Sequence, residues 1–147
     1  MAMKITQPVL FMLGAALVAV AYTSVGAQLP ASVLAGVYTD AQAKRGQKVY
    51  SDNCVTCHGD KLQGTDTAGP TLSGPDFVNG WKDMTVAALL SKISSDMPSS
   101  APGTLKPEEY ADVLSFVLST NKYPAGKSEL PTDPAALKGV KMAAAPK

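Results

Sequence analysis

The sequence predicts an all-α domain with long irregular loops, and three observations support this fold class. Apolar residues recur at steps of three and four in three stretches, which is the spacing of an amphipathic helix. No stretch alternates apolar and polar residues over the length of a strand. Glycine and proline are frequent between residues 59 and 80, so this segment is expected to be a long ordered loop.

The first residues of the chain are typical of a secretory signal peptide. Residues 1–27 hold one cation, Lys4, followed by an uncharged apolar run from Val9 to Val20. Small residues at positions 25 and 27 favour cleavage before Gln28. An uncleaved anchor helix is the alternative, because mild apolarity continues past the run. In both cases the domain is expected to lie outside the cytoplasm, in the periplasm, and to be membrane-associated only if the signal is kept.

With 147 residues the chain is long enough for one domain. A small, apolar segment without clear periodicity precedes the first helical pattern. After Tyr123 the composition shifts to proline, alanine and lysine, with no apolar stripe long enough to bury itself. The predicted division is therefore a signal peptide (1–27), a lead-in segment (28–38), a helical domain (39–124) and an extended or disordered tail (125–147).

The first predicted helix runs to residue 53 and begins after Thr39. Thr39 and Gln42 have the spacing of a capping box, in which each residue satisfies a backbone N–H near the other. Gly46, Val49 and Tyr50 follow at helical spacing. The loop of residues 59–80 comes next, and a loop of this length in a compact domain requires something other than secondary structure to organise it.

Two further helices are predicted after the loop. Asp83 is the expected cap of the second, which ends before Pro98 and has an apolar stripe of Val86, Leu89, Leu90 and Ile93. The third starts at Pro107 with two glutamates in its first turn, and its stripe comprises Tyr110, Val113, Leu114 and Val117. Lys106 is a poor cap, and a hydrophobic staple between Leu105 and Tyr110 is expected to compensate.

The charge pattern excludes some partners without naming one. Removal of Lys4 with the signal leaves twelve basic and twelve acidic residues, so the mature chain is formally neutral. The lysines are scattered, and no basic block with interleaved aromatic residues is present. We therefore expect no binding to nucleic acid.

Chemistry is expected at Cys54-Val55-Thr56-Cys57-His58. Haem attached through thioethers needs two thiols that reach the two vinyl groups and an adjacent imidazole that reaches the iron, and this segment supplies all three. A disulfide between Cys54 and Cys57 would close a very small loop and stabilise the fold little. A zinc site would lack ligands, because the chain has two cysteines and one histidine. A thioredoxin-like redox pair, or two incidental cysteines beside a histidine, would also show this spacing, but the strand-helix-strand context of a redox pair is missing.

Residues 39–124 resemble a class I cytochrome c domain. The matching residues are the haem-attachment segment, Gly46 with Tyr50, Gly69-Pro70-Thr71-Leu72, Met97-Pro98 and an aromatic-bearing last helix. The resemblance implies three main helices with long loops that wrap one covalently bound haem c. It also implies that the first helix crosses the last one at Gly46 and Tyr50.

The resemblance also implies roles for residues around the haem. The second ring N–H of the proximal ligand His58 would be donated to the carbonyl of Pro70, which is otherwise a plain turn proline. With no second histidine in the chain, the thioether of Met97 is the best candidate for the sixth ligand, although Met84 is a rival and Met97 could be a packing residue. Trp81 could donate its indole N–H to a propionate or simply be part of the core.

With both axial positions filled, such a protein would be an electron carrier and not an enzyme. Its expected partners are redox proteins: a dehydrogenase or membrane complex as donor and an oxidase or another cytochrome as acceptor. Two further readings of the function stay open. One is a tightly bound electron-transfer subunit of a quinoprotein dehydrogenase, because the ending Tyr123-Pro124-Ala125-Gly126 with Glu129-Leu130-Pro131 resembles tails of cytochromes associated with such enzymes. The second is a gas sensor or enzyme with a labile sixth ligand.

Overall fold

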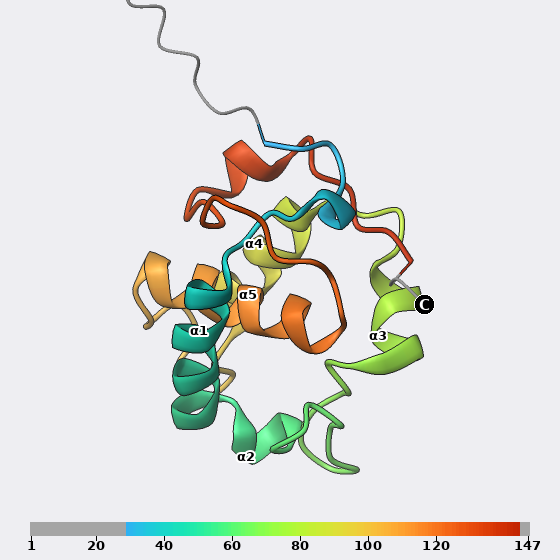
Figure 1. Cartoon of the computed structure of the whole chain (residues 1–147). Helices are drawn as coiled ribbons and strands as arrows, with labels where there is room; N and C mark the ends of the chain where they lie inside the picture. The colour runs from blue at the N-terminus through green and yellow to red at the C-terminus, as the bar shows by residue number, and fades with distance from the viewer. Residues whose placement is uncertain (1–28, 145–147) are drawn as a thin grey trace, which may run out of the picture.

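A computed structural model describes residues 29–144 of the chain, and it confirms the predicted all-α fold class (Figure 1). Among these residues extended backbone pairs only in isolated bridges. The predicted signal peptide and its cleavage site lie outside the described residues. The elements, in chain order, are η1 (Val33–Ala35), α1 (Asp40–Asn53), α2 (Val55–His58), α3 (Gly74–Trp81), α4 (Val86–Asp96), α5 (Pro107–Thr120) and η2 (Pro134–Leu137).

Helix α1 packs across α5 at the glycine that the sequence singled out (Figure 1). A Cβ atom at Gly46 would overlap the carbonyl group of Asp112 in α5, so only glycine permits this approach. One turn later, the ring of Tyr50 lies 5.3 Å from that of Phe116, measured between ring centroids. The predicted crossing of the first and last helices is confirmed.

Helix α1 begins after Thr39, as predicted, but only one of the two hydrogen bonds of the expected capping box is present. Thr39 Oγ1 accepts a hydrogen bond from the backbone N–H of Gln42 at 3.1 Å. The side chain of Gln42 does not return to Thr39, because it is buried and pairs with the backbone of Leu130 instead. The reciprocal half of the box was therefore predicted wrongly.

Helix α4 has a different cap from the one predicted. Thr85 is the N-cap, and its hydroxyl accepts a hydrogen bond from the N–H of Ala88 at 3.1 Å. Asp83 lies two residues earlier in the left-handed region with a φ of 69°, a conformation that a short polar side chain tolerates in a turn. The helix ends at Asp96, as its stripe and Pro98 predicted.

Helix α5 begins at Pro107, as predicted, although Lys106 is its cap. The backbone N–H of Lys106 donates to the Glu109 side chain at 2.8 Å, which compensates for the poor capping residue. The contact expected between Leu105 and Tyr110 includes a hydrogen bond, because the Leu105 N–H donates to the tyrosine hydroxyl at 3.3 Å. This contact fixes the direction in which the chain enters α5.

The long loop was predicted correctly only in its first part. Residues 59–73 are irregular, but α3 (Gly74–Trp81) lies in the stretch that was expected to lack regular structure. Phe77 is buried, and its ring packs 6.4 Å from that of Trp81, one helical turn later. The frequent glycines concealed this short apolar stripe.

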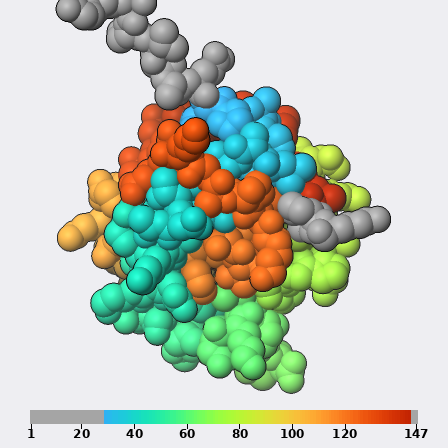
Figure 2. All heavy atoms as spheres, viewed as in Figure 1, coloured from blue at the N-terminus to red at the C-terminus, as the bar shows by residue number. Residues whose placement is uncertain are grey.

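The predicted extended or disordered tail is instead packed against the domain through residue 144. Its backbone is largely irregular, but Leu130, Leu137, Val140 and Met142 are each at most 2% exposed. Lys141 forms isolated bridges with Ser32 in the lead-in segment and with Thr85 before α4. Figure 2 shows the two ends of the described chain against one another. The tail buries separate apolar residues, which a search for a helical stripe does not detect.

None of the helices between residues 29 and 144 is long and apolar enough to cross a membrane.

Candidate functional site

A cavity of about 670 Å³ is lined by residues of all five α-helices, of the loop between α2 and α3 and of the segment that follows α4. Much of its wall is apolar, and this part includes Leu72, Phe77, Leu89, Ile93, Val113 and Val117. All six residues that the sequence analysis selected line this one cavity: Cys54, Cys57, His58, Pro70, Trp81 and Met97. The fold therefore brings together residues that span 44 positions of the chain, from Cys54 to Met97.

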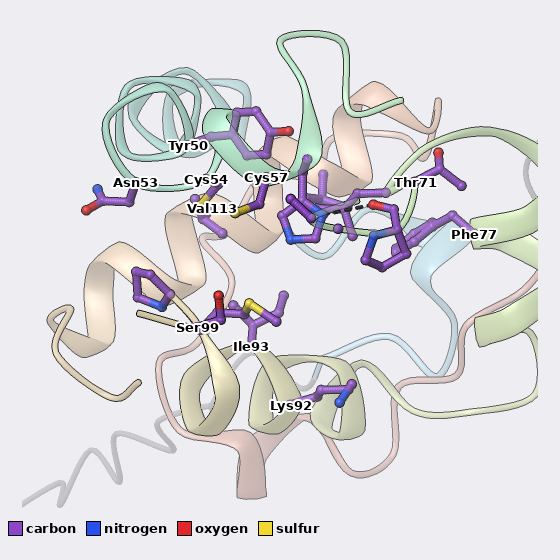
Figure 3. A pocket seen from close by; sticks show the side chains of 18 of the residues that line it. Tyr50, Asn53, Cys54, Cys57, Thr71, Phe77, Lys92, Ile93, Ser99 and Val113 are labelled. Carbon is purple, nitrogen blue, oxygen red and sulfur yellow. Dashed lines mark hydrogen bonds between the residues drawn. The ribbon is translucent and has the colours of Figure 1, made fainter. Parts of the chain in front are cut away.

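Both cysteines lie on one wall of the cavity, with their sulfur atoms visible in Figure 3. Helix α1 ends at Asn53, and the N–H of Cys54 still donates to the carbonyl of Tyr50 at 2.8 Å. The chain then turns into α2, where the N–H groups of Cys57 and His58 donate to the Cys54 carbonyl at 3.2 and 3.0 Å. This tight turn keeps the two thiols and the imidazole on a common side. The thiols form no disulfide.

The environment of Cys54 does not suit a dithiol redox pair. Burial, and then the neighbouring Cys57 thiol, raise the pKa of the Cys54 thiol to about 11. A redox pair of the thioredoxin kind depends on a thiol whose pKa is lowered, because the thiolate is the nucleophile. The neutral, half-buried thiol fits a sulfur that becomes a thioether better.

His58 is buried and its ring is held by the loop that follows α2. Its Nδ1 atom lies 2.8 Å from the carbonyl oxygen of Pro70. A carbonyl can only accept, so Nδ1 carries the proton and the lone pair of the neutral ring is on Nε2. A Cβ at Gly69 would stand 3.0 Å from the imidazole ring, so a side chain at this position would crowd His58.

Met97 lines the cavity from the end of α4. In Figure 3, Ile93 and Ser99, which lie on either side of it in the sequence, are across the cavity from Cys54 and Cys57. Two hydrogen bonds fix its backbone: its N–H donates to Ile93 at 3.1 Å, and its carbonyl accepts from the Tyr110 hydroxyl at 2.8 Å.

The two remaining methionines of the described residues do not line this cavity. The rival candidate Met84 is 43% exposed on the surface. Met142 is buried under the C-terminal segment, at 2% exposure. Met97 is therefore the methionine that the fold offers to the cavity.

These residues fit a covalently attached haem. The cavity has the volume of a site for a ligand of this kind, and much of its wall is apolar. It offers two thiols, one imidazole with a free nitrogen and one thioether sulfur, which are the donors of a His/Met-ligated haem c. A zinc site fits less well, because no group of three or more Cys, His, Asp or Glu side chains gathers within residues 29–144.

Residues 41–117 match the family described as cytochrome c oxidase, cbb3-type, subunit III. The chain belongs to this cytochrome c family. It is 29% identical over 89 residues to the "Cbb3-type cytochrome c oxidase subunit CcoP" of Azospirillum brasilense. The aligned region covers 59% of this chain but only 30% of that protein. This cytochrome c domain therefore spans about a third of the length of its curated relative.

A solved structure with similarity to the chain is the sulfane dehydrogenase SoxCD from Paracoccus pantotrophus. The TM-score is 0.44 with 21% sequence identity, over 61% of this chain and 52% of that one. Membership of a cytochrome c family implies covalently bound haem c and transfer of electrons.

Trp81 lines the cytochrome's cavity from the last residue of α3 and is half-buried. It packs on Phe77, so it belongs to the core as well as to the cavity wall. Its position is compatible with both of the roles that the sequence left open.

Two tyrosines support the site in ways that the sequence analysis missed. The Tyr50 hydroxyl donates to the carbonyl of Gly59 at 2.6 Å and ties the end of α2 to α1. Burial, followed by the charges of Cys54 and Asp60, raises the pKa of Tyr50 to about 12. Tyr110 holds the backbone of Met97 through its hydroxyl. The sequence pattern placed Tyr50 and Tyr110 on the apolar stripes of their helices and did not indicate these hydrogen bonds. The position of Tyr50 one helical turn before Cys54 was the one sequence feature that could have pointed to its role.

Proposed function

We propose that this protein is a periplasmic mono-haem c-type cytochrome that transfers single electrons between redox partners. Cys54 and Cys57 would hold the haem through thioethers, and His58 and Met97 would be its axial ligands. The observation that carries the proposal is that the chain's one histidine and one of its methionines line the same apolar cavity as both cysteines. The haem would supply reversible one-electron chemistry at its iron.

The loop after α2 orients the proposed proximal ligand. The bond from His58 Nδ1–H to the Pro70 carbonyl selects the tautomer with a free Nε2 lone pair and makes the imidazole more basic toward a metal. The absence of a side chain at Gly69 leaves room for the ring in this position. The ligand is thus held in position by the protein before any metal bond forms.

The proposed distal ligand is held by its backbone as well. Hydrogen bonds to Ile93 and from Tyr110 fix both polar groups of the Met97 peptide units, so its side chain starts from a defined point on the cavity wall. If His58 and Met97 both held the haem iron, no coordination position would remain for oxygen, peroxide or a substrate. This arrangement supports electron transfer without substrate chemistry.

The apolar part of the wall would lower the dielectric constant around the site. Side chains such as Leu89, Val113 and Val117 penalise extra positive charge in the cavity. A thioether ligand acts in the same direction, because it favours the reduced metal. We expect a relatively high reduction potential.

The test is to produce the chain in cells that attach haem c and to purify the holoprotein. Mass spectrometry of the wild type should show one covalent haem, whereas a Cys54→Ala, Cys57→Ala double variant should carry none. A redox titration of the wild type should give a high midpoint potential. A protein without covalent haem would contradict the proposal, and a strongly negative midpoint would remove Met97 as a ligand.

A second candidate function is that of an electron-transfer subunit in a larger oxidoreductase. Two observations favour it: the curated relative is named as an oxidase subunit, and the C-terminal segment is an ordered layer outside the matched residues. A quinoprotein dehydrogenase is the partner that the sequence of this segment suggests. Co-purification of a dehydrogenase or oxidase with the tagged protein from native membranes would favour a subunit, and isolation of a free monomer would favour a mobile carrier.

A haem gas sensor with a labile sixth ligand is a less favoured function. The backbone hydrogen bonds of Met97 argue against this function, because a labile sixth ligand would have to move away from the iron. Carbon monoxide binding by the reduced protein at neutral pH would reverse this preference.

A further inference from the structure

We propose that Tyr110 is a positioning residue for the proposed sixth ligand, because its hydroxyl group closes the loop that follows Met97. This inference rests on the electron-transfer function proposed above. The loop, called the distal loop below, consists of residues 98–105 between α4 and the N-cap of α5. In this role Tyr110 sets how readily the methionine gives up its place to another ligand.

One hydroxyl group holds both ends of the distal loop. The Tyr110 hydroxyl donates to the carbonyl of Met97, directly before the loop, at 2.8 Å. It also accepts from the N–H of Leu105, the last residue of the loop, at 3.3 Å. A tyrosine hydroxyl can donate and accept at once, so it serves both ends together. Tyr110 lies in α5 and is only 4% exposed, so its own position is fixed by the core.

The rest of the distal loop is only lightly attached to the domain. Residues 99–104 are all exposed. Two hydrogen bonds of 2.8 Å lie within the loop, from the Ala101 N–H to the Pro98 carbonyl and from the Thr104 hydroxyl to the Ala101 carbonyl. In the part of the chain that the structure describes, the bond between Leu105 and Tyr110 is the one hydrogen bond that joins this loop to a residue outside it. Leu105 also packs against the core.

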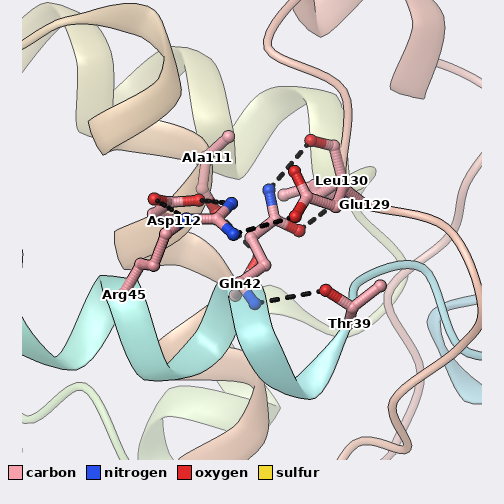
Figure 4. Close-up of polar contacts among 8 residues, drawn as sticks. Thr39, Gln42, Arg45, Ala111, Asp112, Glu129 and Leu130 are labelled. Carbon is pink, nitrogen blue, oxygen red and sulfur yellow. Dashed lines mark hydrogen bonds and ion pairs between the residues drawn. The ribbon is translucent and has the colours of Figure 1, made fainter.

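The C-terminal segment is held differently. The Gln42 side chain bonds to both backbone groups of Leu130 (Figure 4). Beside it, Arg45 forms an ion pair with Glu129 at 2.9 Å (Figure 4). Loss of one such contact leaves others in place, whereas loss of one hydroxyl frees both ends of the distal loop.

The hydroxyl affects ligand exchange if Met97 moves together with its backbone. An external ligand takes the sixth position only when the thioether leaves it, and the thioether leaves by moving outward with the exposed loop that follows it. This movement separates the Met97 carbonyl from the Tyr110 hydroxyl. A hydrogen bond that is present in the ligated state and lost in the displaced state favours methionine ligation, by roughly a factor of five for a bond of ordinary strength.

The experiment is an optical titration of the oxidised haem-bearing protein with imidazole, a small external ligand for ferric haem. Tyr110→Phe keeps the buried ring and removes the hydroxyl. We expect this variant to bind imidazole about five- to thirtyfold more tightly than the wild type, the lower value for one lost bond and the higher for two. Each measurement uses the purified haem-bearing fraction, so a lower yield of the variant does not affect the comparison.

The matched control is Tyr123→Phe. Tyr123 is 3% exposed, and its hydroxyl donates to the carbonyl of Ala143 at 2.6 Å, away from the cavity lining. The control loses a hydrogen bond of the same kind, so it should bind imidazole within about twofold of the wild type. An equal gain in affinity in both variants would indicate general loosening of the protein and would overturn the inference.

A second measurement needs no variant. Exchange of the Leu105 N–H with heavy water, followed by NMR, should be at least about fivefold faster with saturating imidazole than without it, because displacement of Met97 opens the loop. An unchanged exchange rate, or an unchanged imidazole affinity in Tyr110→Phe, would mean that the methionine leaves by rotation of its own side chain. Either result would overturn the inference while the haem-based function stands, and protein without covalent haem would overturn both.

Discussion

The contact between Gln42 and Leu130 gives a sharp test of how the C-terminal segment is held. The Gln42 amide nitrogen donates to the Leu130 carbonyl at 3.1 Å, and its oxygen accepts from the Leu130 N–H at 2.7 Å. Both bonds are buried, and both residues are only 2% exposed. One side chain of α1 therefore satisfies both backbone groups of a residue 88 positions away.

Replacement of Gln42 by alanine leaves two buried backbone groups without partners. An unpaired buried polar group costs about 1–3 kcal/mol, so the variant should lose about 2–4 kcal/mol of unfolding free energy after some relaxation of the segment. This is a large part of a total stability that is typically about 5–15 kcal/mol. Urea unfolding of the haem-bearing protein followed by circular dichroism would measure the loss.

Three comparisons make the result interpretable. Gln47→Ala, at an exposed position of the same helix, should change stability by less than about 0.5 kcal/mol. Gln42→Glu can accept from the Leu130 N–H but can donate to its carbonyl only when protonated, so burial should raise the pKa of the new carboxyl group. Its stability should be greatest at acidic pH and fall as pH rises through that raised pKa. Equal stability of Gln42→Ala and Gln47→Ala would refute the proposed role of this contact.

Two further predictions concern packing and pH. Gly46→Ala should cost about 1–3 kcal/mol or prevent folding, because the added methyl group would overlap Asp112, whereas Gly139→Ala should be nearly neutral in the same urea experiment because a Cβ there meets no neighbour. The pKa of Tyr50, raised to about 12, favours the neutral phenol in the folded protein, so this stability is complete below pH 10 and is lost as pH rises toward 12. Tyr50→Phe should lose the hydrogen bond to Gly59 and show a shallower alkaline decline; an unchanged slope would assign that decline to different groups.

The elements that could be predicted from the sequence are those whose signals are local. Thr39 before α1 and Pro107 at the start of α5 mark their helices because capping depends on a few adjacent residues. The N-cap of α4 was predicted wrongly because two polar residues, Asp83 and Thr85, precede this helix. Thr85 has the extended backbone of an N-cap, whereas Asp83 is in the left-handed region. Helix α3 is short, and its start at Gly74 lies among residues that normally interrupt helices.

The C-terminal segment was beyond local reasoning. Leu130 and Leu137 are isolated apolar residues in a proline- and lysine-rich stretch, and they become buried only because surfaces distant in sequence receive them. The side chain of Gln42, which pairs with the backbone of Leu130, was expected from the sequence to form a local cap instead. Non-local contacts of this kind are invisible to periodicity and propensity.

The candidate site could be proposed from the sequence because a haem-attachment motif is nearly contiguous in the chain. Cys54, Cys57 and His58 are nearly contiguous, and the cavity that they line contains Pro70, Trp81 and Met97 as well. The supporting hydroxyls of Tyr50 and Tyr110 could not be predicted, because each bonds to a backbone carbonyl that only the folded loops bring near. The pattern thus indicated the ligand candidates but not the groups that hold them.

The central claim, a haem held between His58 and Met97, is tested most directly by the absorption spectrum of the oxidised protein. Methionine ligation to ferric haem c gives a weak far-red charge-transfer band. We predict this band in the wild type and in Met84→Ala, whose side chain is exposed outside the cavity lining, and its loss in Met97→Ala. A wild-type spectrum without the band, or a band that survives Met97→Ala, would contradict the account.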